Sequence, residues 1–520
     1  MTQSRRWYPL VDGTIVMSLL VLGTITRLGA LAPPSLWLDD AWVALVIRAD
    51  TVGDVVRMGV TAPGFAVVLG AWLSVVGFSE LAAQMIPFLA GVISAGLVYV
   101  AGRWAGLGRG PAFVGGILLA LSPVAITYSS RVKQYTVESV LAVLLIALAL
   151  RLMGRIDDRR GWIVFAVAVL GATFMSTSLA LYGAAPFFVG AVSSWRRGDR
   201  AHARWVALVA TSTGAVLATW YLGHLRGVTP AALADYWSRY YISIDSGLSQ
   251  TARQLLAALR RLMGGLTGLV DLGNVALDAA AVAMLVALVL VARRDLRRAV
   301  VLIAPLGLAA ALAMLKLAPL GGGRTDLYLY PSLVFLLIAG IDAVSRPRQK
   351  PNRRPRAYRH AAWVFVAVAV LVLEGSRVER PTYRLQDVRS LVTVLESRMD
   401  AGDVVLVYPH TAFAFGLYSP FDVDIDTSKE WQGLPFTVTF PSPEVTVLPY
   451  SRDDPDNYRP TVEAAAHGHD RVWLISSHRS KDYGALLEII GKSGLSVQDK
   501  VKSPGAELLL FGRGDVSSSP

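Results

Sequence analysis

Long apolar runs recur along the first three quarters of the chain, and each is about as long as a membrane-spanning helix. An α-helix needs about 20 mostly apolar residues to cross the hydrocarbon core of a bilayer. Runs of this kind lie near residues 11–32, 81–101, 110–128, 136–154, 161–180, 181–195, 204–223, 274–292, 298–317, 325–344 and 361–378. The pattern predicts a polytopic α-helical membrane protein with about eleven spans.

Residues 63–77 form a further apolar run, which is too short for a comfortable crossing. Counting it as a span would reverse the side of every later loop. We therefore expect a re-entrant or interfacial helix here, inside a first outer loop at residues 33–80.

After residue 379 the pattern changes to short apolar strands, such as 404–408 and 472–475. Helical stretches are expected between the strands, near 385–399, 459–467 and 481–493. This alternation is typical of an α/β domain with a largely parallel sheet. We expect a transmembrane domain over residues 1–379 and a soluble α/β domain over residues 380–520.

The composition agrees with a membrane protein. Of the 520 residues, 54% are hydrophobic and 17% charged, whereas soluble domains carry about 25% charged residues. The formal net charge is +12, but the arginines occur in clusters between apolar runs, which favours a role in topology over nucleic-acid binding. The chain has no cysteine, so it can form neither disulfides nor thiolate metal sites.

The basic clusters alternate with loops that are poor in Lys and Arg. They lie at residues 103–109, 151–160, 196–204, 293–298 and 346–359. The positive-inside rule places these loops and the N-terminus in the cytoplasm. The same rule places the α/β domain on the outer side of the cell membrane. Separately, the Arg-rich, Lys-poor composition favours a bacterial source.

Two adjacent carboxylates, Asp39 and Asp40, lie in the first outer loop among Trp and Leu residues. Ionisable groups beside hydrocarbon are costly, so they are functional-site candidates. One carboxylate can act as a general base toward a hydroxyl while the other orients it. Asp is also a favoured N-cap, so the pair can instead cap the helix that starts near Ala41.

Basic residues gather on the same predicted side of the membrane. Arg131, Lys133 and Arg324 can clamp a phosphate through charge-assisted hydrogen bonds. Backbone N–H groups of glycines 321–323 can approach the same anion. Arg131 and Lys133 can also simply snorkel to the membrane surface, and a glycine run can be a flexible linker.

Further polar and aromatic residues on this side are candidate substrate ligands. They are Tyr135, Glu138, Asp326, Trp237 and Tyr240. Glu138 can alternatively pair with Lys133 or Arg131, and the two aromatic residues fit an interfacial belt as well as a sugar platform. His467 and His469 have no accompanying ligands in the sequence, so no metal site is expected.

The order of these motifs resembles that of the GT-C superfamily of polyprenyl-phosphate-dependent glycosyltransferases. The similarity is to the branch of the protein O-mannosyltransferases and bacterial aminoarabinose transferases, over about residues 1–345. It is carried by Leu38-Asp39-Asp40-Ala41-Trp42, Ala62-Pro63-Gly64-Phe65, Phe78-Ser79-Glu80, the segment 128–138 and Gly323-Arg324. The chain departs from the pattern at Thr61-Ala62, where some relatives carry a basic residue, and at Asp326, where Tyr is more usual.

The resemblance implies an outer active site, a sugar donor on polyprenyl phosphate, an inverting single displacement, and no obligatory metal or other cofactor. Asp39 matches the catalytic base of the family and Asp40 its second acid. The acceptor would be a cell-wall glycan, a glycolipid or a protein.

Two other interpretations remain open from the sequence. One is a transporter of lipid-linked saccharides, and the other is an envelope scaffold protein without catalysis. The transporter predicts a charged path across the membrane, whereas the later spans hold few ionisable residues apart from Lys316.

Overall fold

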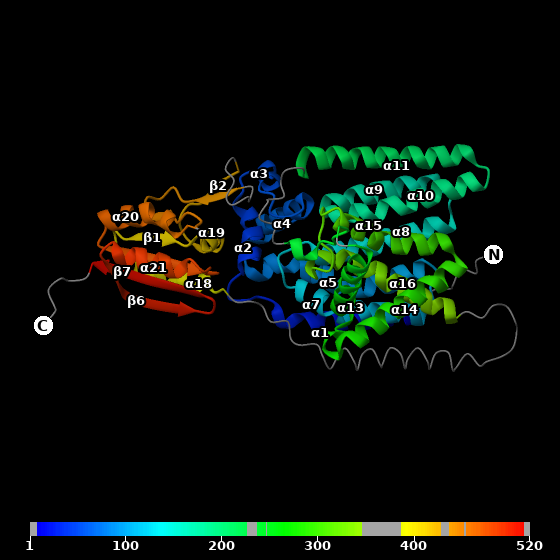
Figure 1. Cartoon of the computed structure of the whole chain (residues 1–520), viewed down its shortest axis with the longest axis horizontal. Coiled ribbons are helices and arrows are strands. Elements are labelled where there is room, and N and C mark those ends of the chain that lie inside the picture. The colour runs from blue at the N-terminus through cyan, green and yellow to red at the C-terminus, as the bar shows by residue number, and fades with distance from the viewer. Residues whose placement is uncertain are drawn as a thin grey trace. The chain divides into compact units, whose positions relative to one another are not determined.

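Helices dominate the first part of the chain, and a five-stranded sheet lies near its end (Figure 1). The computed structural model describes residues 8–225, 237–245, 247–345, 386–427, 436–451 and 454–513. Contacts divide the chain into two units. The helical unit comprises Met1–Ala30 and Met85–Thr382, and the α/β unit comprises Leu31–Gln84 and Tyr383–Pro520.

The helical unit is built from helices, most of them long and apolar. They are α1 (Pro9–Arg27), α5 (Glu80–Trp104), α6 (Arg109–Leu121), α7 (Pro123–Tyr128), α8 (Tyr135–Gly154), α9 (Arg159–Met175), α10 (Leu181–Arg196), α11 (Arg200–Trp220), α13 (Leu248–Thr267), α14 (Gly273–Arg294), α15 (Leu296–Met314) and α16 (Tyr330–Ser345). A 3₁₀ helix, η7 (Arg324–Leu329), leads directly into α16.

Ten of the eleven expected spans coincide with helices. Within the described residues, eight helices are long and apolar enough to cross a membrane, and α6 is a shorter apolar helix. The expected span at 110–128 is broken at Ser122, which caps α7 ahead of Pro123. The expected span at 361–378 lies outside the described residues.

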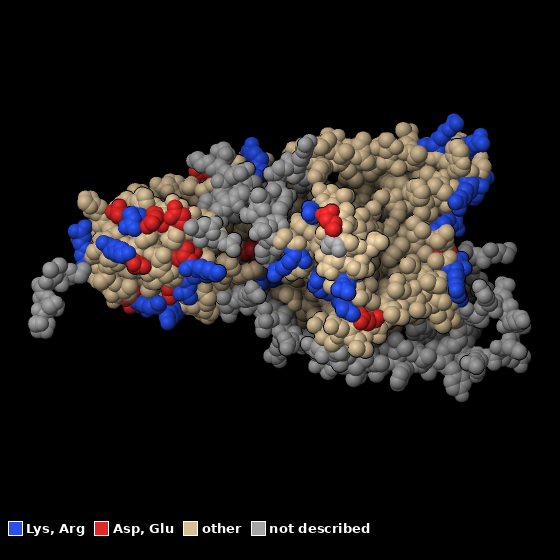
Figure 2. Space-filling model, viewed as in Figure 1, with Lys and Arg blue, Asp and Glu red and all other residues tan. Residues whose placement is uncertain are grey.

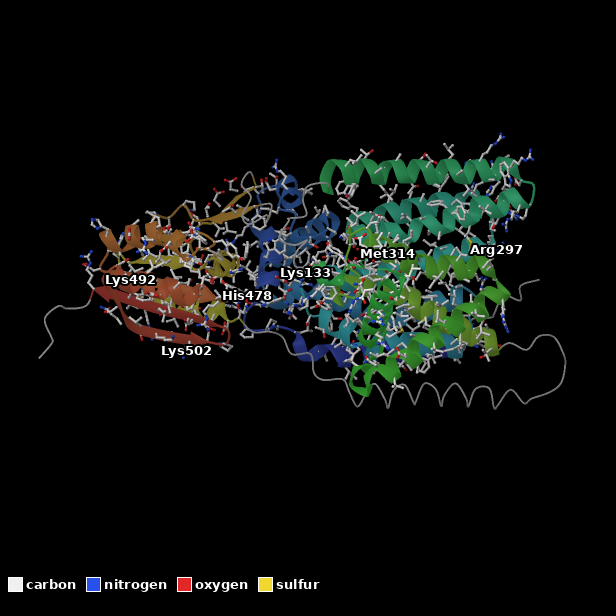
Figure 3. All side chains as sticks on the ribbon, in the orientation of Figure 1. Lys133, Arg297, Met314, His478, Lys492 and Lys502 are labelled. Atoms are coloured by element: carbon white, nitrogen blue, oxygen red, sulfur yellow. The ribbon has the colours of Figure 1, made fainter. Side chains whose placement is uncertain are left out.

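Aspartates cap the helices that follow several of the basic turns. Asp158 accepts the backbone N–H of Gly161, and Asp199 accepts that of His202. Asp295 accepts the N–H groups of Arg297 and Arg298. These caps satisfy N–H groups that have no partner inside the helix. Lys and Arg gather at one end of the helical unit in Figure 2, and Figure 3 places Arg297 at that end.

The helices pack closely where small residues face each other. Gly340 of α16 lies against Ala287 of α14, so closely that a Cβ built on Gly340 would be 2.5 Å from the Ala287 Cβ. Small residues at such crossings let two helix backbones approach, which is how helices associate without help from the hydrophobic effect.

The α/β unit joins the first outer loop to the C-terminal segment. Its loop helices are α2 (Leu38–Ala44), α3 (Val52–Arg57) and α4 (Pro63–Val76). The expected short helix at residues 63–77 is therefore present, and its 14 residues bury Phe65, Leu69 and Leu73. The domain boundary expected at residue 379 remains a prediction, but by contacts residues 31–84 group with the C-terminal segment.

The remaining elements of the α/β unit include the expected helices and strands, although β6 and β7 follow each other directly. The helices are α18 (Val388–Arg398), α19 (Ala412–Tyr418), α20 (Arg459–Gly468) and α21 (Tyr483–Lys492), and the strands are β1 (Val404–Val407), β2 (Asp424–Asp426), β3 (Thr437–Thr439), β4 (Val445–Val447), β5 (Arg471–Ser477), β6 (Leu495–Ser503) and β7 (Ala506–Arg513).

The main sheet is mixed, with strand order β4-β1-β5-β7-β6. Strand β1 runs parallel to β4 and β5, as expected. The last two strands are instead an antiparallel hairpin, and β7 pairs antiparallel with β5. The turn of this hairpin contains Gly505 at φ 70°, a backbone conformation that favours glycine.

We predict that Gly340→Leu lowers the free energy of unfolding by about 1–3 kcal/mol, because the new side chain has no room at the α14–α16 contact. Gly214→Leu in α11 is the matched control, since a Cβ there meets nothing within 4 Å. Thermal unfolding of both variants in detergent measures the effect. Equal midpoints would contradict the close helix contact.

Candidate functional site

The acidic pair lies in the first turn of α2, in the α/β unit. Asp40 is fully buried and Asp39 is partly exposed. The N-cap of α2 is Trp37, whose carbonyl accepts the N–H groups of Asp40 and Ala41. The interpretation of Asp39 or Asp40 as the N-cap is therefore wrong. Carboxylates in a first turn still interact favourably with the helix dipole.

Residues from the C-terminal segment hold the chain that leads into α2. The N–H of Leu36 donates to the Tyr418 hydroxyl at 2.7 Å, and the N–H of Leu38 donates to Oε1 of Gln386 at 3.1 Å. Burial raises the pKa of the Tyr418 phenol, so this hydroxyl stays protonated at neutral pH. The position of Asp39 thus depends on residues more than 340 positions away in sequence.

The basic turn after α7 lies in the helical unit. Arg131 and Lys133 are both buried, although each carries a charge. Figure 3 shows Lys133 at the opposite end of the helical unit from Arg297. Lys133 is therefore separated from the basic turn that contains Arg297. A charge retained inside the protein needs a compensating interaction. Whether these two cations bind a ligand or snorkel to the membrane surface stays a prediction.

Arg324 takes part in a cluster of arginines and aromatic rings. Its guanidinium lies 5.2 Å from the centre of the Trp237 ring, and the rings of Trp237 and Tyr240 are 5.7 Å apart. Arg239 and Arg261 lie over the Tyr240 ring at 5.0 and 5.5 Å. The structure thus brings together three predicted site residues, Arg324, Trp237 and Tyr240, in cation–π geometry.

The glycine loop before η7 binds a carboxylate of the protein itself. Asp326 is fully buried, and its two oxygens accept the N–H groups of Gly321 at 3.2 Å and Gly323 at 2.9 Å. Gly321 and Gly323 have φ values of 82° and 74°, which favour glycine. The N–H groups expected to approach a phosphate are therefore used by Asp326, whose observed role is to hold the loop.

Glu138 and Tyr135 lie in the first turns of α8. Glu138 is almost fully buried, and Ser176 donates its hydroxyl to Oε1 of Glu138 at 2.7 Å. The ring of Tyr135 meets that of Tyr128 edge-on at 5.2 Å. Helix η7 packs against α8, so Glu138 and Asp326 belong to neighbouring elements.

Sequence reasoning missed Arg27, at the end of the first span. Its guanidinium is fully buried and donates to the carbonyls of Leu119 and Ala120, in the last turn of α6, and to the Ser129 hydroxyl. A cation at a helix C-terminus is stabilised by the negative end of the helix dipole. An arginine inside an apolar run was the available signal, because such a residue needs partners in the protein.

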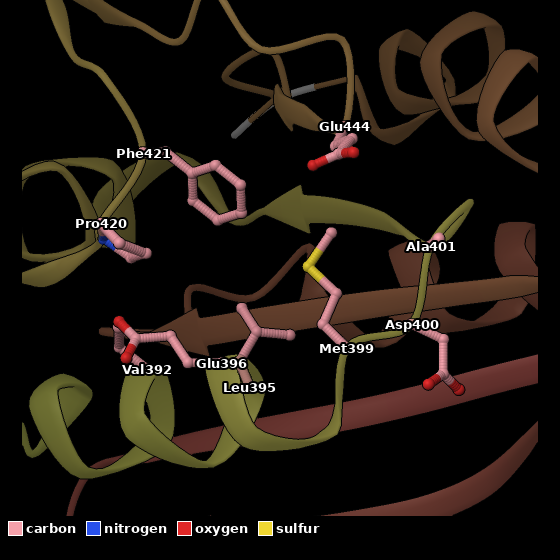
Figure 4. Close-up of a pocket in the computed structure, with 9 residues that line it drawn as sticks. All are labelled: Val392, Leu395, Glu396, Met399, Asp400, Ala401, Pro420, Phe421 and Glu444. Atoms are coloured by element: carbon pink, nitrogen blue, oxygen red, sulfur yellow. The ribbon is translucent and has the colours of Figure 1, made fainter.

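Among the hollows of the described residues, one lies apart from these side chains and another ends beside them. One, of about 480 Å³, is on the α/β unit between α18 and the start of β4, and is lined by Leu395, Met399, Phe421 and Glu444 among others (Figure 4). The other, of about 280 Å³, lies between α13 and α15 and is lined only by apolar residues and Gly307, ending at Leu320. Within the described ranges, no group of three or more His, Asp or Glu residues could hold a metal ion.

Comparisons with known proteins fit this architecture. The family described as Dolichyl-phosphate-mannose-protein mannosyltransferase matches residues 60–221. The structure of ArnT from Cupriavidus metallidurans bound to undecaprenyl phosphate is similar over 97% of this chain and 98% of that one, with a TM-score of 0.56 and 15% identity. The chain therefore has the GT-C fold. No curated protein sequence matches it.

Two other GT-C structures are similar to the chain. The archaeal oligosaccharyltransferase AglB from Archaeoglobus fulgidus, in complex with an inhibitory peptide and a dolichol-phosphate, aligns with 98% of this chain and 75% of its own, with a TM-score of 0.51 and 11% identity. The mycobacterial arabinofuranosyltransferase AftD aligns with 98% of this chain and 42% of its own, with a TM-score of 0.50 and 16% identity. The GT-C fold and the eight candidate spans make this a multi-pass membrane protein.

We predict that Asp326→Asn lowers the free energy of unfolding by about 1–3 kcal/mol, because the amide nitrogen then faces a backbone N–H donor. Asp245→Asn is the control, since Asp245 is exposed. Thermal unfolding in detergent measures both. An unchanged midpoint for Asp326→Asn would show that the carboxylate does not hold the glycine loop.

Proposed function

We propose that the protein transfers one sugar from a polyprenyl-phosphate carrier to a hydroxyl of an extracytoplasmic acceptor, with inversion at the anomeric carbon. The observation that carries this proposal is the group of cations at the end of the helical unit opposite Arg297. Arg131 and Lys133 are buried in the turn after α7. Helix α7 contacts η7, which begins at Arg324, so the three cations come from adjoining elements.

The apolar hollow between α13 and α15 suits the lipid chain of such a donor. Its lining includes Leu255, Leu259, Leu262 and Leu306, and it ends at Leu320. The next residue, Gly321, accepts a hydrogen bond from Arg261, whose guanidinium belongs to the arginine and aromatic cluster. The phosphate of the donor would lie among the arginines of this cluster, and its polyprenyl chain would lie along the leucines of the adjoining hollow. ArnT and AglB, which have the same fold, were solved in complex with undecaprenyl phosphate and a dolichol-phosphate, respectively.

The reaction needs one base and a stabilised leaving group. Asp39 takes the proton of the acceptor hydroxyl as the hydroxyl oxygen forms a bond to the anomeric carbon. The bond from that carbon to the phosphate oxygen breaks, and its electron pair leaves with the polyprenyl phosphate. Arg131, Lys133 and Arg324 offset the charge that develops on that phosphate, and they do so strongly because the surroundings are of low dielectric. Asp40, fully buried in the first turn of α2, is the supporting group in this scheme.

The basic turns at the other end of the helical unit support an orientation for the chain. The positive-inside rule places them in the cytoplasm. The proposed donor site then faces the outside of the cell membrane, with the N-terminus in the cytoplasm and the α/β unit outside. The acceptor would be a cell-wall glycan, a glycolipid or a protein, and no metal is required.

We predict that Asp39→Asn lowers kcat by about 10²- to 10⁴-fold, the usual contribution of a general base, while donor binding is unchanged. The assay uses purified protein in liposomes with synthetic polyprenyl-phosphate sugars and detects the product and its anomeric configuration. Asp50→Asn is the matched control, because Asp50 is an exposed carboxylate in the same loop. Near-normal transfer by Asp39→Asn would exclude it as the base, and lipid movement without any product would favour a transporter.

Removing one of these cations should weaken binding of the sugar donor as well as slow the transfer step. We predict that Arg131→Gln and Lys133→Gln each raise the Kd for polyprenyl phosphate roughly 10- to 100-fold, as expected for the loss of a charge-assisted hydrogen bond. Arg297→Gln, at the opposite end of the unit, is the control. Binding is measured by tryptophan fluorescence or calorimetry in detergent. Wild-type affinity in both variants would contradict the donor site.

A further inference from the structure

One glutamine side chain connects the start of α2 to the C-terminal part of the α/β unit. The amide of Gln386 is buried, and its Oε1 accepts the N–H of Leu38 at 3.1 Å. Its Nε2 lies 3.0 Å from Nδ1 of His478. Leu38 directly precedes Asp39, so the chain from His478 through Gln386 ends one residue from the proposed base.

The hydrogen-bond directions in this chain follow from chemistry. A backbone N–H can only donate, so the end of the Gln386 amide that faces Leu38 must be the oxygen. The other end is then the NH₂ group, which also only donates. Nδ1 of His478 must therefore accept, which requires a neutral imidazole with its proton on Nε2. Neither end of the amide can turn round without placing two donors face to face.

The backbone at His478 is held in an unusual conformation. His478 is the first residue after β5, and its φ is 47°, in the left-handed region that non-glycine residues adopt uncommonly, with Asn, Asp and His the most frequent exceptions. Its ring lies 5.2 Å from that of His410, which follows β1, and 6.5 Å from that of Trp37. Strain of this kind tends to occur where function requires a side chain in one place. Glycine would relieve the strain but would remove the imidazole.

We propose that His478 and Gln386 are a positioning pair for Asp39. The neutral imidazole of His478 fixes the Gln386 amide, the amide fixes the N–H of Leu38, and the first turn of α2 is thereby held in the orientation that the base requires. This inference rests on the proposed function in one respect, that Asp39 is the base. Neither residue contacts the reacting atoms in this scheme.

The test separates positioning from general stability. His478→Gly relieves the backbone strain but leaves the buried NH₂ group of Gln386 without its acceptor. These two effects on stability oppose each other, so the unfolding midpoint should change little while kcat falls. Misplacement of a catalytic group by about 1 Å can cost roughly 10²-fold, and we expect a loss of about 10-fold to 100-fold with donor KM unchanged. If His478 had only a structural role, activity would fall in proportion to stability. An unchanged kcat in His478→Gly would also overturn the proposal.

Gln386 provides the second arm. Gln386→Met keeps the length of the side chain but removes both hydrogen bonds, and should lower kcat as much as His478→Gly. In Gln386→Glu, one carboxylate oxygen still accepts the hydrogen bond from the Leu38 N–H. The other can accept a hydrogen bond from Nδ1–H of His478 in its other tautomer or its protonated form. This variant should therefore keep much of the kcat that Gln386→Met loses. The double variant Gln386→Met/His478→Gly should be no slower than either single variant, because both remove the same tether. Additive losses of kcat in the double variant would contradict the shared role of the two residues.

Two controls make the outcomes distinguishable. His467→Gln changes an exposed histidine in α20 of the same unit and should leave kcat unaltered. Asp39→Asn is measured in the same liposome assay. If Asp39→Asn retains transfer, the assignment of the base fails and the positioning pair has nothing to position. If Asp39→Asn abolishes transfer but the His478 and Gln386 variants keep full kcat, only the positioning proposal fails.

Discussion

An ion buried among apolar helices must find its counter-groups within the protein, and this constraint shapes the whole helical unit. The cost of an uncompensated charge is high enough that partners are needed at every such site. Asp12 of α1 accepts two hydrogen bonds from Arg109, each at 2.9 Å, and one from Tyr99. Arg27, at the other end of α1, is satisfied by the last carbonyls of α6. The first helix is thereby tied at both ends to its neighbours.

The same constraint decides which charges are available to a ligand. Asp326 and the glycine N–H groups satisfy each other, so neither is open to a phosphate. Arg324 and Arg261 lie over aromatic rings, which attract a cation without neutralising its charge. In the proposed donor site the positive charge would come from side chains, and the backbone of the glycine loop would contribute shape.

Hydropathy predicted the spans well because the period and length of an apolar helix are local properties of the sequence. The strands around 404–408 and 472–475 were local signals of the same kind. The pairing of Asp326 with Gly321 and Gly323 was not predictable, since a short carboxylate and a glycine run fit several loop conformations. The contact between Leu38 and Gln386, 348 positions apart, has no trace in either segment alone. Nor did the strand pattern reveal that β6 and β7 pair antiparallel.

The grouping of residues 31–84 with residues 383–520 has a consequence for how such proteins can diversify. The segments are separated in sequence by the helical unit, yet the N–H groups of Leu36 and Leu38 have their partners on Tyr418 and Gln386. A chimera that exchanges only the C-terminal segment would leave these buried donors facing foreign side chains. Recombination between relatives would therefore succeed only when both segments move together, so the loop and the distant segment should be inherited, and engineered, as one cassette.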